Sequence, residues 1–471
     1  MNRIIHNITI YLVIAIFSLM GAVPAFASET VFDGAAEPPE TSATSVMLMD
    51  AGNGEILYEK DAYEKRDPAS ITKILNCLVC LDTLDFDQEV TVDIDPETEG
   101  SIMKLKKGET LRIEDIVYGM MLWSANDGAE FLGHLAGEGD MKAFCDMMNA
   151  KARDLGAKDT KYVNPNGLNG AAVNNVTTAY DIAVIVKEAM KDERFRQIVG
   201  TQEYVIGATN KYKERKLTNS NMCLWSDDIR KAAEGDPIAL DEYEEAYRSN
   251  PYNYIGDDDA AVRNAARDEA KQLSELMYKP CIGVKTGYSS TAGDCFAGFA
   301  KKGNTEIIAV VLNAPHTKNK FQDAKKLWKY SYDNFKTYTA QASSSFEYQL
   351  AVKRGALREV ELGMAEDLKV TTLKKDDPSA TVTTELKLPE EKPMAPIHKG
   401  DVMGQIVASY NGEEVERLDL ISMETCEEGG ILSYIGIADE DAPKFLALAG
   451  TALITLIIII ALIRRSRSRR R

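Results

Sequence analysis

Residues 67–75 read DPASITKIL and begin a segment that is apolar on nearly every side. Such a pattern is typical of a helix buried in a protein core. Ser70 precedes Lys73 by three positions, which places a hydroxyl and an amine on one face of the predicted helix, at its amino end. A lysine in a buried helix needs a reason, because burial disfavours the charged ammonium form. The pair therefore indicates either a structural or a catalytic role.

Both ends of the chain carry apolar segments. Residues 1–27 combine Arg3, a short apolar stretch and the small-residue site Ala25-Phe26-Ala27, which predicts a secretory signal peptide. At the other end, Phe445–Ile463 is an uninterrupted run of 19 apolar or small residues, about 28 Å long as a helix and enough to cross a membrane. Six arginines follow within residues 464–471 and are expected on the cytoplasmic side. We expect a single-pass membrane protein whose main part lies outside the cell.

The charge of the chain argues against a nucleic-acid partner. The formal net charge is −18, and removal of Arg3 and the six C-terminal arginines leaves about −25 on the exported part. The arginine tail directly follows the predicted span, so we interpret it as an orientation signal rather than a nucleic-acid-binding segment.

Cysteine and histidine usage limits the possible chemistry. Cys77 and Cys80 form a lone C-x-x-C within the apolar helix, with no second pair and no neighbouring histidine, so we interpret them as small buried hydrophobic residues. The chain has seven cysteines in all and only four histidines, which leaves little for a histidine-based mechanism.

Strand-like and helical patterns predict a first domain that extends over most of the chain. After a loose linker at 28–42, residues 43–60 predict a β-hairpin, helical periodicity dominates from 71 to about 189, and strands return over 282–313. Strands at both ends with helices between them predict an α/β (α+β) domain over 43–340 whose sheet is completed by distant segments.

Two further regions depart from this pattern. Residues 226–278 hold 14 acidic and 6 basic residues with good helix formers, and we interpret them as an inserted, solvated helical excursion. Residues 345–440 contain short alternating runs separated by Gly, Pro and Asp clusters, which predicts a separate small β-rich domain.

Two polar triplets give the serine–lysine pair a context. Ser124-Ala125-Asn126 follows an apolar helical segment, and Lys285-Thr286-Gly287 ends the predicted strand IGVKTGY and is followed by Tyr288. The order S-x-x-K, S-x-N, K-T-G is the signature of penicillin-recognising serine acyl-transferases. A lone S-x-x-K is a weak signal, but the three elements in this order are specific.

The chain resembles the low-molecular-mass penicillin-binding proteins, which are serine-type D-alanyl-D-alanine carboxypeptidases. The resemblance extends from about residue 43 to the tail and includes YVNPNGLNG at 162–170, Asn219-Ser220-Asn221, and a late APIHKGDVMGQIVASYNGEEV typical of the β-rich domain that follows the catalytic domain. It implies a β-lactamase-like catalytic domain, a small all-β domain and one C-terminal transmembrane helix.

The resemblance also implies catalytic roles for five residues. Ser70 is expected to be the nucleophile and Lys73 its base, with the pKa of Lys73 lowered by burial and by Lys285 as a second cation. Ser124 is expected to relay a proton to the leaving amine, and Asn126 to orient Lys73 and bind the substrate amide.

Four more positions are expected to bind substrate. Thr286 would hold the terminal carboxylate, Gly287 would leave room for ligand along the strand edge, and the backbone N–H of Tyr288 would complete an oxyanion hole with that of Ser70. Lys320 stands where the family often has an arginine, so it would offer a point charge instead of a two-pronged contact. Asn166 stands where the family often has histidine, and we interpret its turn as structural.

The resemblance implies removal of the terminal D-alanine from peptidoglycan pentapeptides, with β-lactam antibiotics as acylating inhibitors and no metal or organic cofactor. An endopeptidase that cuts peptide cross-links uses the same chemistry and stays open. A β-lactamase would need a carboxylate to activate its deacylating water, for which Glu214 is the nearest candidate. A non-catalytic scaffold would require the loss of a catalytic group, and all are present.

Overall fold

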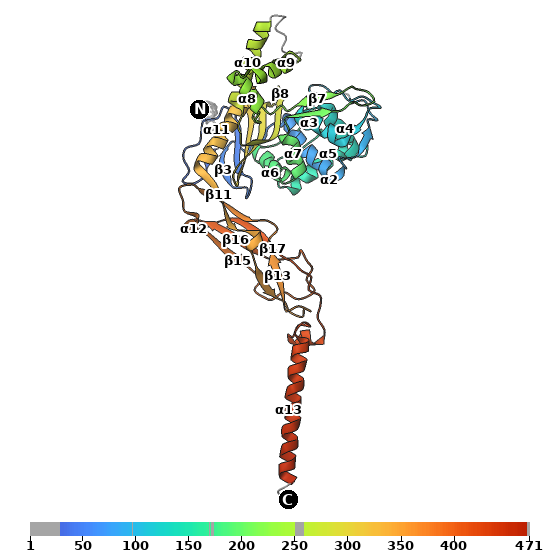
Figure 1. Cartoon of the computed structure of the whole chain (residues 1–471), viewed down its shortest axis with the longest axis vertical. Helices are drawn as coiled ribbons and strands as arrows, with labels where there is room; N and C mark the ends of the chain where they lie inside the picture. Colours follow the sequence, from blue (N-terminus) through green and yellow to red (C-terminus); the bar gives the residue numbers. More distant parts are fainter. Residues whose placement is uncertain (1–28, 97, 169, 171–173, 250–258, 469–471) are drawn as a thin grey trace, which may run out of the picture. The chain divides into compact units, whose positions relative to one another are not determined.

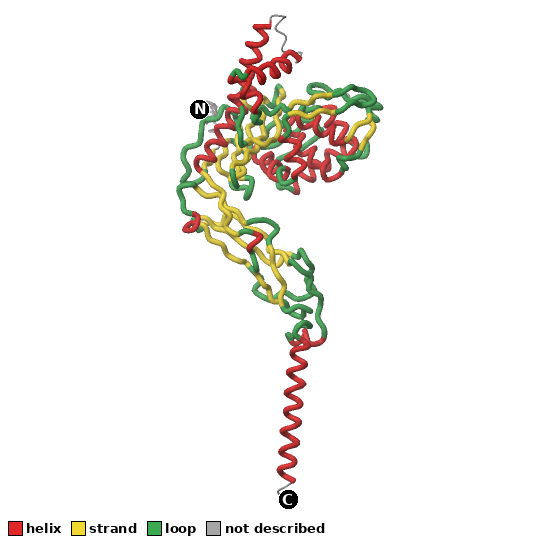
Figure 2. Tube along the Cα trace, viewed as in Figure 1, coloured by secondary structure: helices red, strands yellow, loops and turns green. Residues whose placement is uncertain are grey.

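The computed structural model describes residues 29–96, 98–168, 170, 174–249 and 259–468 (Figures 1 and 2). The chain divides into two compact units between Asn334 and Phe335. The predicted signal peptide, residues 1–27, lies outside the described residues.

A six-stranded antiparallel sheet forms the centre of the first unit. Its order is β1-β3-β2-β10-β9-β8, so the strands of the early hairpin pair with strands from far along the sequence. The strands are β1 (Glu29–Val31), β2 (Ser45–Asp50), β3 (Ile56–Lys60), β8 (Cys281–Ser289), β9 (Gly293–Lys302) and β10 (Thr305–Ala314). This arrangement confirms the α/β prediction that distant segments complete one sheet, and it leaves β8 at the edge.

Helices cover both faces of this sheet (Figure 1). Helix α6 (Ala179–Ala189) packs against β2, β9 and β10, and alternate residues such as Ile308 and Val310 join its hydrophobic core. Helix α11 (Thr317–Asn334) packs against β9 and β10, where Phe296 contacts the rings of Phe321 and Trp328. Because side chains alternate along a strand, a strand covered on both faces is apolar along its covered length, as β10 is from Ile307 to Leu312.

A helical lobe holds Lys73 and Asn126, two of the predicted catalytic residues. It contains α2 (Lys73–Thr83), α3 (Ile113–Leu122), α4 (Asn126–Ala136), α5 (Met141–Asp154) and α7 (Glu193–Gly200), together with the hairpins β4 (Glu89–Thr91)–β5 (Thr110–Arg112) and β6 (Glu203–Ile206)–β7 (Arg215–Thr218). In α2, Cys77 and Cys80 are buried and form no disulfide with each other, and burial raises the pKa of both thiols, as expected of hydrophobic core residues.

The acidic segment after residue 226 is helical, as predicted. It contains α8 (Asp227–Glu234), α9 (Pro237–Ser249) and α10 (Asp259–Leu276), which surround a small core of their own around Leu240 and Ala270. The acidic side chains stay at the surface because that core needs only one face of each helix.

The second unit is rich in β-structure, as expected. A five-stranded antiparallel sheet has the order β12-β13-β17-β16-β15, and β11 pairs with β14. The strands are β11 (Phe335–Gln341), β12 (Tyr348–Ala351), β13 (Glu359–Gly363), β14 (Leu368–Leu373), β15 (Val382–Lys387), β16 (Val402–Tyr410) and β17 (Glu413–Ser422). Because β11 pairs with β14, the unit begins at Phe335 rather than at the expected residue 345.

One long apolar helix ends the second unit. Helix α13 (Ala442–Ser468) contains a stretch, Ala442–Arg465, with a mean hydropathy of 2.9 and none of it buried against the protein. By length and composition it is a candidate membrane span, and it includes the predicted Phe445–Ile463.

Candidate active site

Ser70 and Lys73 meet at a junction between two helices. Ser70 lies in a 3-10 turn, η1 (Ala69–Thr72), and Lys73 is the first residue of α2. The expected single α-helix is therefore wrong in its first turn, because residues 69–72 form the tighter helix typical of α-helix N-termini. The pair is nevertheless close, since Lys73 Nζ lies 2.9 Å from Ser70 Oγ.

The Lys73 amine is enclosed by oxygen acceptors. Lys73 is 0% exposed, and Nζ lies 2.7 Å from Asn126 Oδ1 and 2.6 Å from the backbone oxygen of Asn166, besides its contact with Ser70. Burial and, next, the positive charge of Lys285 lower the pKa of Lys73 well below its ordinary value, while Asp127 opposes the shift. A neutral amine can satisfy this geometry by donating its two N–H groups to Asn126 and Asn166, which leaves its lone pair for the proton of the Ser70 hydroxyl.

Helix α4 brings Asn126 to Lys73 and is held by a neighbouring loop. Asn126 Nδ2 donates to the carbonyl of Glu99 at 2.5 Å, and its backbone N–H donates to Ser101 at 2.7 Å. The carboxylate of Asp127 accepts the backbone N–H groups of Met103 and Leu105, each at 2.9 Å. These bonds fix the rotamer of Asn126 from outside the site.

The turn at 164–168 packs under the serine, as the structural interpretation predicts. Gly167 has φ +86°, and a Cβ there would lie 1.9 Å from the Ala69 carbonyl oxygen and 3.0 Å from the Ser70 nitrogen. The turn therefore approaches the nucleophile so closely that only glycine fits. It also supplies the Asn166 carbonyl, a contact that the sequence did not reveal because it comes from the backbone.

Strand β8 carries the second lysine and a threonine. Lys285 is 1% exposed and donates to the Thr286 carbonyl at 3.2 Å, and burial and then Lys320 lower its pKa to about 7. The Thr286 hydroxyl lies 2.6 Å from that of Ser220, and the Ser220 N–H donates to the Leu122 carbonyl. The sequence marks Ser220 only as part of the triplet Asn219-Ser220-Asn221, and its contact with Thr286 joins positions 66 residues apart.

Gly287 is needed for packing rather than for ligand space. A Cβ at Gly287 would lie 3.1 Å from the Pro68 carbonyl oxygen and 3.3 Å from the Ile71 nitrogen. The room expected for ligand is thus occupied by the turn that presents Ser70. Tyr288 has a side chain that is 68% exposed and lies opposite Asp294 in the ladder between β8 and β9.

Lys320 is not free to act as the expected anion-binding charge. It is 4% exposed and pairs with Asp294 at 2.8 Å, and it also lies 3.5 Å from the Gly287 carbonyl. The structure gives it a different effect, because its charge contributes to the lowered pKa of Lys285. The pairing with Asp294 was not predictable from spacing, since it joins α11 to β9.

Ser124 sits in a sharp bend before α4. Its φ is +62°, its side chain is half-buried, and its hydroxyl forms no hydrogen bond to any other described residue. A non-glycine residue with positive φ is uncommon and points to a constrained position.

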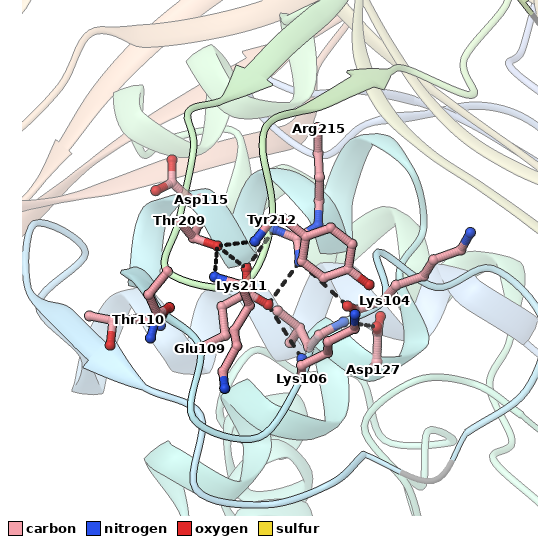
Figure 3. Close-up of polar contacts among 12 residues, drawn as sticks. Lys104, Lys106, Glu109, Thr110, Asp115, Asp127, Thr209, Lys211, Tyr212 and Arg215 are labelled. Atoms are coloured by element: carbon pink, nitrogen blue, oxygen red, sulfur yellow. Dashed lines mark hydrogen bonds and ion pairs between the residues drawn. The ribbon is translucent and has the colours of Figure 1, made fainter.

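A buried ion pair stabilises one wall of the helical lobe, formed by the β6–β7 hairpin and the loop before β5 (Figure 3). Glu109 is 0% exposed, and its two oxygens accept from Arg215 Nη1 and Nη2, each at 2.8 Å. Although burial alone would raise the pKa of Glu109, hydrogen bonds from Arg215 and Thr209 lower it below its ordinary value. Arg215 also donates to the Lys104 carbonyl, so the β6–β7 hairpin is tied to the loop that holds Asn126.

Two acidic groups near this wall, Asp127 and Glu109, are occupied. Asp127 accepts three backbone N–H groups, and Glu109 is paired with Arg215. Glu214, the candidate carboxylate for a β-lactamase, is exposed and lies in the β6–β7 hairpin, directly before Arg215.

The site has the residues of a serine acyl-transferase of the penicillin-recognising class. One side supplies Ser70, Lys73 and Asn126, and the other supplies Lys285 and Thr286. A family model described as D-alanyl-D-alanine carboxypeptidase matches residues 33–232, and one described as penicillin-binding protein 5, C-terminal domain, matches residues 332–428. The chain belongs to the D-alanyl-D-alanine carboxypeptidase family.

Three relatives illustrate the extent of the similarity. D-alanyl-D-alanine carboxypeptidase DacF of Bacillus subtilis is 26% identical over 413 residues, which covers 86% of this chain and 90% of that protein. A D-alanyl-D-alanine endopeptidase of Escherichia coli is 31% identical over 223 residues, 45% of this chain and 70% of that protein. The crystal structure of penicillin binding protein 5 from Haemophilus influenzae matches with a TM-score of 0.60 and 23% identity over 83% of this chain and all of that one, and shows the shared fold.

Proposed function

We propose that this chain is a D-alanyl-D-alanine carboxypeptidase that removes the terminal D-alanine of peptidoglycan stem peptides through an acyl-Ser70 intermediate. The observation that carries the proposal is the buried Lys73 amine, 2.9 Å from the Ser70 hydroxyl. A serine hydroxyl is a weak nucleophile at its own pKa and needs an adjacent base. Lys73 is that base.

Acylation begins with a proton transfer. Lys73 takes the Ser70 proton while Oγ attacks the carbonyl carbon between the two D-alanines. An ester bond to Ser70 forms, the C–N bond to the terminal D-alanine breaks, and the proton passes from Lys73 through Ser124 to the leaving amine. Water then cleaves the ester, which releases the shortened peptide and restores the serine.

Substrate binding uses the edge of the sheet. Among the described strands, β8 has a neighbour on one side only, so an extended peptide pairs with its other edge as an added strand would. Thr286, together with the charge of Lys285, holds the terminal carboxylate, and Asn126 binds the substrate amide. The N–H groups of Ser70 and Tyr288 stabilise the oxyanion, each contributing about 10²–10³ in rate.

The location follows from the ends of the chain. Helix α13 anchors the enzyme as a single-pass protein of the cell membrane, with the arginines that follow it on the cytoplasmic side and the catalytic unit on the cell-wall side. Residues 1–27 serve as the export signal. β-Lactams acylate Ser70 as substrate mimics.

The carboxypeptidase is favoured over the endopeptidase. The carboxypeptidase from Bacillus subtilis aligns over 86% of this chain, including the β-rich unit, whereas the endopeptidase aligns over 45%. The two activities differ in whether the leaving group is free D-alanine or a cross-linked peptide.

The proposal is tested with the full chain in detergent. It is incubated with a pentapeptide that ends in D-Ala-D-Ala, with Ser70→Ala as the control. We expect one D-alanine released per peptide by the native enzyme and none by the variant. Cleavage of a cross-linked peptide dimer without release from the pentapeptide would instead establish an endopeptidase, and rapid turnover of penicillin would establish a β-lactamase.

A further inference from the structure

Five exposed lysines gather on the wall beside the site. They come from the stretch KLKK at 104–107 and from KYK at 211–213, and we call them the lysine rim: Lys104, Lys106, Lys107, Lys211 and Lys213. None of the five forms an ion pair with another described residue, and Lys106 lies 4.4 Å from the centre of the Tyr212 ring. Glu214, directly after Lys213, is an exposed carboxylate on the same hairpin, so the five lysines outnumber it, which is unexpected in a chain with a formal net charge of −18.

A buried frame holds the two segments of the lysine rim together (Figure 3). The Glu109–Arg215 pair joins the loop to the hairpin, and Arg215 stacks 3.9 Å from the centre of the Tyr212 ring. Asn210 adds a second link, because it accepts from the Thr110 N–H at 2.9 Å and donates to the Gly108 carbonyl at 2.7 Å. The lysine side chains are exposed, and these contacts hold the backbone that carries them.

The lysine rim adjoins the active site through the loop that holds Asn126. The Asn126 N–H donates to Ser101, and the carboxylate of Asp127 accepts from Met103 and Leu105, which flank Lys104. Thr286 and Asn126 contribute from opposite walls of the site, on β8 and α4. A peptide whose terminal carboxylate lies at Thr286 and whose upstream amide lies at Asn126 therefore leaves the site toward residues 101–107.

We infer that the lysine rim binds carboxylate groups on the part of the substrate peptide that precedes D-Ala-D-Ala. This inference rests on the proposed function and adds a preference for stem peptides with free side-chain carboxylates over amidated ones. Lysine suits this task, because its ammonium is a compact charge on a long flexible stem that reaches carboxylates at several positions. Exposed contacts of this kind contribute to affinity and encounter rate, and salt weakens them.

The test compares two peptides that share the D-Ala-D-Ala end. One carries two free glutamyl carboxylates upstream, and the other carries the same residues amidated. With the full chain in detergent at low salt, we expect kcat/KM to be about tenfold higher for the free acid, and the ratio to fall toward one in molar salt. Lys107→Glu with Lys211→Glu should abolish the preference by slowing the free acid.

A matched control changes the same charge elsewhere. Lys158→Glu with Lys329→Glu alters two lysines that are exposed on other elements and should keep the native preference. Labelling of Ser70 by a fluorescent penicillin should persist in both double variants, which shows that the site is intact.

Three results would overturn the inference. Equal turnover of the two peptides by the native enzyme would contradict the carboxylate preference but would still support the proposed carboxypeptidase activity. Equal loss of preference in the control variant would assign the effect to net charge. Competition by a phosphate-bearing polymer without any peptide preference would assign the lysine rim to a polymer ligand. If neither peptide releases D-alanine, the proposed function fails as well.

Discussion

The hydroxyl groups of Ser220 and Thr286 lie 2.6 Å apart, across a gap of 66 positions that contains the whole helical insertion. Ser220 is itself held by its N–H bond to the Leu122 carbonyl, two residues before Ser124. One hydrogen-bonded chain thus links the segment before α4 to the strand that carries Lys285. This contact joins the two walls of the site.

Ser220→Ala should weaken substrate binding more than it slows chemistry. It removes one partner of the Thr286 hydroxyl, a loss of about 0.5–1.5 kcal/mol, so we expect KM for the pentapeptide to rise about two- to tenfold with a smaller change in kcat. Steady-state D-alanine release measures both constants. Ser274→Ala, on the exposed side of α10, is the control and should leave KM unchanged. An unchanged KM in Ser220→Ala would show that Thr286 does not need this partner.

Lys285 should set the alkaline limb of the pH profile. Its pKa is lowered to about 7, so the charge that we propose binds the substrate carboxylate is lost as pH rises through that value. We expect kcat/KM for the free enzyme to fall above about pH 7. Lys285→Arg keeps its charge at higher pH and should shift this limb upward, even if its maximum rate is lower. A limb that stays in place in the arginine variant would assign it to another group.

Lys285 should also reduce stability below its ordinary pKa. The ordinary value is 10.5 and the folded value about 7, so the unfolded chain binds the extra proton between these pH values and the folded state loses stability as pH falls from 10.5 to 7. Lys285→Met removes the titrating group. We expect its Tm to exceed that of the native chain most below about pH 7 and to converge with it near pH 10.5, with D-alanine release strongly reduced. Equal Tm values across this range would contradict a buried, destabilising amine.

Gly167→Ala should disrupt the site through a clash with the backbone. Its Cβ would lie 1.9 Å from the Ala69 oxygen, whereas Gly156 has a similar φ of +89° and nothing within 4 Å of an added Cβ. The control Gly156→Ala therefore measures the cost of positive φ alone, about 1–2 kcal/mol. We expect the free energy of unfolding of Gly167→Ala to be lower than that of Gly156→Ala by about 1–3 kcal/mol. Gly167→Ala should also be acylated poorly by fluorescent penicillin. Similar Tm values for the two variants would show that the turn can move away from Ser70.

Local patterns predicted much of this fold. The hairpin at 45–60, the strands after residue 281 and the helical insertion all follow from periodicity and turn residues, because burial on one or both faces leaves a regular trace in sequence. The three motifs predicted that Lys73 lies near Ser70 and Asn126, and both contacts are present, whereas Ser124 forms no hydrogen bond to another described residue. The start of the second unit at Phe335 was missed, since β11 is defined by its pairing with β14.

The less predictable part of the site consists of contacts made by backbone atoms or by distant partners. The Asn166 carbonyl at Lys73 has no side-chain signal, and the Lys320–Asp294 pair depends on how α11 packs on the sheet. For Gly287, sequence indicates only that a side chain is absent. The structure shows that the space is filled by the turn before Ile71.

The central claim is that the Lys73 amine is neutral in the resting enzyme, so that it can accept the Ser70 proton. The most direct test is NMR titration of the full chain with ¹³C-labelled lysine Cε, in which Lys73→Arg identifies the Lys73 signal. The account predicts that this signal titrates well below the ordinary lysine pKa of 10.5, together with loss of acylation in a neutral Lys73→Met variant. A Lys73 signal that titrates with the exposed lysines, or a methionine variant that acylates normally, would contradict it.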